Sequence, residues 1–71
     1  MPRIITVDVH REGRWWVSSI PAADAVAQSA TWRDVRGDAL GVAAAMLDIP
    51  TQRLRIGAVR RTSSSTFTAA N

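Results

Sequence analysis

The feature that most constrains the fold is a strict alternation of apolar and polar residues near the N-terminus, followed after a short turn by a second β-rich run. Ile5, Val7 and Val9 alternate with polar neighbours. This period of two is typical of a strand with one buried face. The turn contains Gly13, a residue that can supply the positive φ that a tight connection often needs. We therefore predict an antiparallel hairpin over residues 4–20.

The rest of the chain predicts two further strands and one helix. Residues 26–29 are long enough for a third strand, and residues 53–58 alternate as a last strand with one apolar and one basic face. Between them, a capping box at residues 31–34 indicates a helix start, and Pro50 indicates that the helix ends by Asp48. The expected apolar face of the helix consists of Trp32, Val35, Ala39, Val42, Ala43 and Met46, with Leu40 and Leu47 at its margin.

These elements predict an α+β domain with the order strand, strand, strand, helix, strand. The sheet has three to four mostly antiparallel strands, and one helix packs on one of its faces. We place the domain at residues 1–59 and expect a disordered tail at residues 60–71, which has one bulky apolar residue. A chain of 71 residues has a thin stability margin, so a partner or a second copy in a homodimer would help it.

Composition bears on the compartment in which the protein works. The chain contains no cysteine, which fits a reducing compartment and excludes thiolate metal sites. Neither a secretory signal nor an apolar run long enough to span a membrane is visible. A cytoplasmic location is the default expectation.

Adjacent tryptophans provide the first candidate for partner binding. Trp15 and Trp16 are neighbours on a strand, so they point to opposite faces of the sheet. We predict Trp15 under the helix and Trp16 on the polar face, where it would anchor a partner together with His10 and Arg14. The alternative is that Trp16 only covers its own cross-strand neighbours.

The outer face of the helix provides a second candidate. Gly37 and Gly41 lie opposite the expected apolar stripe, together with Ala44 and Ala45. A surface of small side chains lets the backbone of another chain approach closely. The alternative is that these residues only reflect a composition rich in alanine and glycine, in a helix that tertiary packing stabilises.

Basic residues suggest a second class of function. The formal charge is +3 and all nine basic residues are arginines. The densest group consists of Arg53, Arg55, Arg60 and Arg61, which could follow a phosphate backbone as a nucleic-acid-binding stripe. The alternative is a solvated edge strand whose charges deter aggregation.

Catalysis is not expected. His10 is the only histidine, and a surface pair with Asp8 is its simplest role. The sequence has no phosphate-binding glycine loop, no nucleophile with a base at recognisable spacing and no metal-ligand cluster. We therefore expect neither an enzyme nor a bound metal or cofactor.

Several segments together resemble the core of HicB-like antitoxins. They are the hairpin 11–17, the strand end Ile20-Pro21, the run 26–29 that leads into the capped helix, and the closing run 46–50. The resemblance covers roughly residues 4 to 58 in the same element order.

This resemblance implies a partial ribonuclease H-like fold without ribonuclease activity. It also implies a role in a toxin–antitoxin system, in which the domain binds and masks a small ribonuclease toxin. The resemblance is to the core alone, without the C-terminal DNA-binding part that many members carry. A small protein partner is therefore the first expectation, and nucleic acid is the second.

Overall fold

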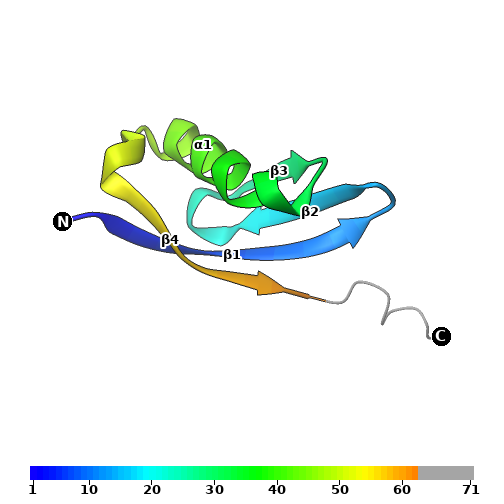
Figure 1. Cartoon of the computed structure of the whole chain (residues 1–71). Helices are drawn as coiled ribbons and strands as arrows, with labels where there is room; N and C mark the ends of the chain where they lie inside the picture. Colours follow the sequence, from blue (N-terminus) through cyan, green and yellow to red (C-terminus); the bar gives the residue numbers. More distant parts are fainter. Residues whose placement is uncertain (63–71) are drawn as a thin grey trace.

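A computed structural model of the chain describes residues 1–62 and shows one helix lying on one face of a four-stranded sheet (Figure 1). The strands follow the spatial order β3-β2-β1-β4, with two antiparallel pairings and a parallel pairing of β1 with β4. The predicted α+β class and element order are confirmed. The elements are β1 (Arg3–Glu12), β2 (Trp15–Ile20), β3 (Ala25–Ser29), α1 (Val35–Leu47) and β4 (Leu54–Arg61).

The β1–β2 hairpin is closed by the two-residue loop Gly13-Arg14, which pairs Glu12 with Trp15. Gly13 has a φ of 58°, the positive value expected at the first position of such a loop. An even number of loop residues pairs odd-numbered residues of β1 with even-numbered residues of β2. The face of β1 that carries Val9 therefore continues on β2 through Trp16.

The core lies between this face of the sheet and α1. Strand residues on the helix side alternate with residues on the other side, as the period of two requires. The buried residues of α1 are Val35, Ala39, Ala43 and Ala44, so small and β-branched side chains form the packed face of the helix. The buried apolar residues in contact are Ile5, Val7, Val9, Trp16, Ile20, Ala23, Ala27, Val35, Ala39, Ala43, Ala44, Leu54 and Ile56.

The start of the helix differs from the predicted capping box. Residues Trp32–Asp34 form a 3₁₀ turn, and the α-helix begins only at Val35. Thr31 Oγ1 donates a hydrogen bond to Asp34 Oδ2 at 2.8 Å, and neither N-cap side chain bonds a helix amide. The two side chains bond to each other and not to the backbone, so the turn tightens before the helix starts.

The buried face of the helix also differs in part from the prediction, whereas the helix ends close to the predicted residue. Asp48 adopts a left-handed conformation with φ of 56°, and the Ile49 amide donates to the Ala44 carbonyl at 3.0 Å, a Schellman-type end. Ala44, expected on the outer face, is buried, whereas Met46, expected in the core, is 60% exposed. Packing on the sheet sets the rotation of the helix about its axis.

Within residues 1–62, no helix is long and apolar enough to cross a membrane.

A bulge in the β1–β4 pairing changes the face of the last strand. Ile5 pairs with Ile56 but Thr6 pairs with Ala58, so Gly57 is an extra residue on β4. Ala58, expected on the apolar face, therefore lies on the opposite side, and Val59 takes its place beside the core. The strand continues to Arg61, beyond the predicted domain end at 59. Of the predicted tail, residues 63–71 lie outside the described residues.

Candidate functional site

One face of the sheet has no covering layer in the part of the chain that the structure describes. Helix α1 lies on the other side, as Figure 1 shows. Three large apolar side chains are exposed on the uncovered face, one on each of three strands: Ile4 at 65%, Trp15 at 40% and Val26 at 59%. We call this surface the open face; the strand pairing also assigns to it Thr6, Asp8, His10, Glu12, Val17, Ser19, Gln28, Arg55, Ala58 and Arg60.

The structure reverses the predicted roles of the two adjacent tryptophans. Trp16 is 8% exposed and belongs to the core, so the predicted Trp16 anchor is wrong. Trp15 is exposed on the open face instead. The prediction assumed that odd-numbered residues of both strands share one face. The two-residue loop instead pairs Arg11 with Trp16, so odd-numbered residues of β1 share a face with even-numbered residues of β2. Counting across a loop of even length was the sequence signal that would have found this arrangement.

The charged groups at the centre of the open face are paired locally. His10 Nε2 lies 2.5 Å from Glu12 Oε2, and the guanidinium Nε of Arg60 lies 3.3 Å from Asp8 Oδ1. The second contact is an ion pair without hydrogen-bond alignment. Asp8 therefore interacts with β4 and not with His10, contrary to the simplest sequence interpretation. No group of three metal-ligating side chains occurs among residues 1–62.

The remaining residues predicted to bind a partner do not share one surface. His10 lies on the open face, whereas Arg14 is exposed at the tip of the hairpin. Gly37 and Gly41 are exposed on α1, on the other side of the sheet, and a Cβ atom on either would meet no atom within 4 Å. A single partner on the open face would therefore not touch the two glycines.

Two tryptophans and two arginines form a cluster on the helix side that the sequence did not predict. The ring centroids of Trp16 and Trp32 are 5.0 Å apart with an interplanar angle of 68°, an edge-to-face arrangement. The guanidinium carbons of Arg11 and Arg61 each lie 4.9 Å from the Trp16 centroid. Arg61 also lies 5.8 Å from the Trp32 centroid. We call these four residues the Trp–Arg cluster.

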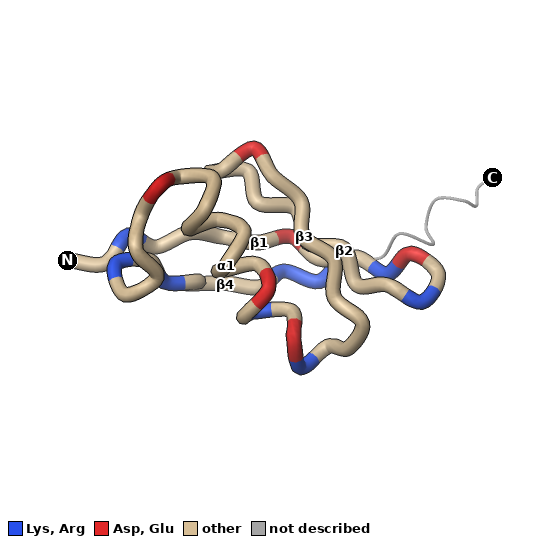
Figure 2. The backbone as a smooth tube through the Cα atoms, turned by 90° about the horizontal axis from the view of Figure 1, so that it is seen from above, with Lys and Arg blue, Asp and Glu red and all other residues tan. Residues whose placement is uncertain are grey.

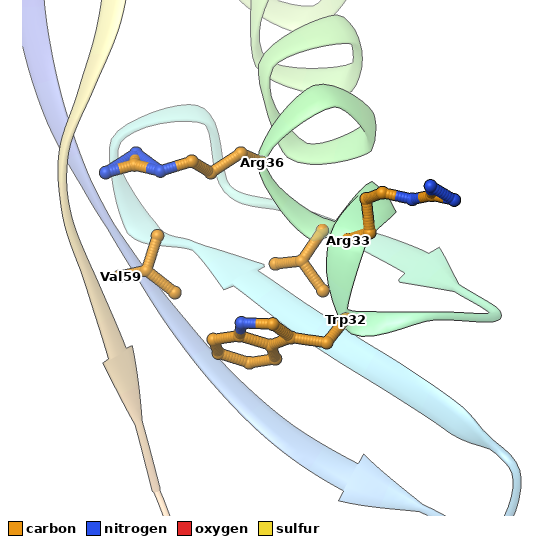
Figure 3. A pocket seen from close by; sticks show the side chains of 5 residues that line it. Trp32, Arg33, Arg36 and Val59 are labelled. Atoms are coloured by element: carbon orange, nitrogen blue, oxygen red, sulfur yellow. The ribbon is translucent and has the colours of Figure 1, made fainter.

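A small cavity opens beside the Trp–Arg cluster, between the start of the helix and β4. Its volume is about 200 Å³, and Trp32, Arg33, Val35, Arg36 and Val59 line it. Figure 3 shows the Trp32 ring below the cavity, Arg36 reaching across toward β4, and the end of Arg33 pointing away. Arg36 is fixed there because its Nη1 donates to the Ile56 carbonyl at 3.2 Å.

The predicted basic stripe does not form a continuous surface. Arg60 lies on the open face with Asp8, whereas Arg61 points to the helix side and contacts the tryptophans. Arg53 belongs to a separate 3₁₀ turn, Thr51–Arg53, and Arg55 pairs with Ile4. Figure 2 shows basic positions spread along the length of the molecule. The alternation of a strand divides consecutive arginines between its faces.

Comparison of the chain with protein-family models, with curated proteins and with solved structures gave no match.

Proposed function

We propose that this chain is a cytoplasmic, non-catalytic protein-binding domain of the HicB-like antitoxin type, which masks a small ribonuclease toxin. The observation that carries the proposal is the open face. A four-stranded sheet with one layer of cover leaves a broad second face for a partner, and this one exposes Ile4, Trp15 and Val26. The element order agrees with that of the antitoxin core, which the hairpin and helix-closing segments resemble.

Trp15 is the expected anchor of this surface. Tryptophan is over-represented among residues that dominate binding energy, because it buries a large area and loses few side-chain conformations. Its 40% exposure leaves much of the ring available to a partner. His10, bonded to Glu12, and the Asp8–Arg60 pair provide polar groups on the same face. This combination of an aromatic anchor and a polar surround is typical of protein interfaces.

The proposal is tested by capture from an extract of the organism that encodes the chain, after nuclease treatment. The wild-type domain should retain a small protein with ribonuclease activity, and adding purified domain should suppress that activity. Trp15→Ala should weaken capture at least tenfold, as expected for loss of a central anchor. Met46→Ala, which removes an exposed apolar side chain from α1, should leave capture unchanged.

Two results would count against the proposal. One is a captured ribonuclease that remains active when the domain is in excess. The other is equal capture by wild type and Trp15→Ala, with both proteins folded by circular dichroism, since this would remove the open face from the interface.

A further inference from the structure

The cavity beside Trp32 combines an aromatic wall with an apolar floor. Val35 and Val59 contribute the floor, from α1 and β4 respectively. At about 200 Å³ the cavity is smaller than the roughly 300–1,000 Å³ pockets that enclose whole small-molecule ligands. It therefore suits one planar ring system whose remaining atoms stay outside.

Trp32 is both exposed and held in place. Trp32 is 47% exposed, a large fraction for so large an apolar residue. The buried Trp16 ring supports it edge to face at 5.0 Å, and Arg61 lies against it at 5.8 Å. A supported and half-exposed indole is a preorganised stacking platform, because it has little freedom left to lose on binding.

Two arginines lie beside this platform. Arg36 and Arg61 are exposed, and neither forms an ion pair with a carboxylate within residues 1–62. The guanidinium group of Arg36 uses one of its five N–H donors on Ile56, which leaves donors for an anion. Arginine donors beside an aromatic face form the combination that proteins use to bind the bases and phosphates of single strands.

We propose that this cavity is a binding site for an unpaired nucleobase of single-stranded nucleic acid. The base stacks on Trp32 over Val35 and Val59, and Arg36 and Arg61 contact the adjoining phosphates. A paired base inside a duplex is already stacked and cannot enter the cavity, so single strands are preferred. The site lies on the helix side of the sheet and is independent of protein binding at the open face.

Fluorescence anisotropy with labelled strands of about 12 nucleotides, a length within the usual site sizes of single-strand binders, tests the proposal on the whole chain. The probes are oligothymidylate, oligouridylate, a duplex of the same length, and an abasic strand with the same phosphates. We expect both single strands to bind at least fivefold more tightly than the abasic strand and the duplex. Affinity should fall as salt rises, because bound phosphates release counterions.

Variants then assign the site. Trp32→Ala should weaken oligothymidylate binding roughly 5- to 150-fold, the range expected for loss of one base–aromatic stack. Arg36→Gln should reduce the slope of log affinity against log salt by about 0.7, the contribution of one phosphate on a single strand. Arg3→Gln is the charge-matched control, because Arg3 lies in β1 opposite Leu54, at the other end of β4 from Val59, and Met46→Ala is the apolar control.

Three outcomes with the strands and the variants would overturn the proposal. They are equal affinity for the abasic and thymidylate strands, preference for the duplex, and equal affinity of Trp32→Ala and Met46→Ala in folded proteins. An acidic peptide that binds as tightly as the single strands would likewise show that only charge is recognised. If Trp32→Ala does not fold, Trp32→Phe and the abasic comparison on the wild-type chain decide the question.

Discussion

Arg61 in β4 places its guanidinium carbon 4.9 Å from the ring centroid of Trp16 in β2, although β1 separates the two strands. Arg11 in β1 lies at the same distance from the same ring. At this end of the sheet, the side chains of Arg11, Arg61 and Trp32 all contact the ring of Trp16. Trp16 is thus a core residue whose ring also contacts two exposed arginines.

Replacing Trp16 should be far more damaging than replacing its neighbour. We expect Trp16→Ala to cost about 3–5 kcal/mol, as for other buried aromatic truncations, against a total stability on the order of 4–10 kcal/mol for a chain of this size. Trp15→Ala should cost less than about 1 kcal/mol because Trp15 is exposed. Urea denaturation followed by circular dichroism measures both. Equal losses would contradict the hairpin register described above.

Two buried serines should respond in opposite directions to removal of the hydroxyl group. Ser18 is 0% exposed and its Oγ has no hydrogen-bond partner among the described residues, so Ser18→Ala should stabilise the fold by about 1 kcal/mol. Ser29 Oγ donates to Asp38 Oδ2 at 2.7 Å, so Ser29→Ala should cost about 1 kcal/mol. Each kcal/mol corresponds to roughly 4–8 °C in Tm. A loss of stability in Ser18→Ala would show that its hydroxyl group is paired.

The bulge on β4 predicts a coupling between Gly57 and Ile4. A Cβ atom at Gly57 would clash with Cγ2 of Ile4, so Gly57→Ala should destabilise the fold by about 1–3 kcal/mol. Ile4→Ala removes that methyl group and leaves only contacts of ordinary length around the new Cβ. The double variant should therefore recover part of the loss, with a coupling of at least about 0.5 kcal/mol in a double-mutant cycle. Strict additivity would show that the clash is relieved elsewhere.

The left-handed end of α1 offers a stabilising substitution. Asp48 has a φ of 56°, a conformation in which glycine avoids the Cβ strain of other residues. We expect Asp48→Gly to raise Tm by a few degrees, and Asp48→Ala, which keeps the Cβ but lacks the polar group, to lower it. Differential scanning calorimetry of the pair measures this. If both variants change Tm in the same direction, the effect comes from the lost carboxylate and not from the backbone.

The strands, the helix and the end of the helix could be predicted from the sequence, because they depend on residues that are close together in the chain. The alternation around Val7 and Val9 predicted β1, and the spacing of Val35, Ala39 and Ala43 predicted a helix with these residues inward. Pro50 predicted that the helix ends before it. The order of the elements along the chain, the single helix and the α+β class follow from such signals, since period and turn chemistry act over a few residues.

The candidate sites depended on pairings that local pattern does not contain. The loop between Glu12 and Trp15 decided which tryptophan is buried, because adding or removing one loop residue exchanges the faces of β2. The bulge at Gly57 turned Val59 toward the cavity and left Arg61 over Trp16. The sequence by itself determined the elements and their order, through short-range periodicity. Only the tertiary structure decided which faces meet, because register and helix rotation are set when elements pack together.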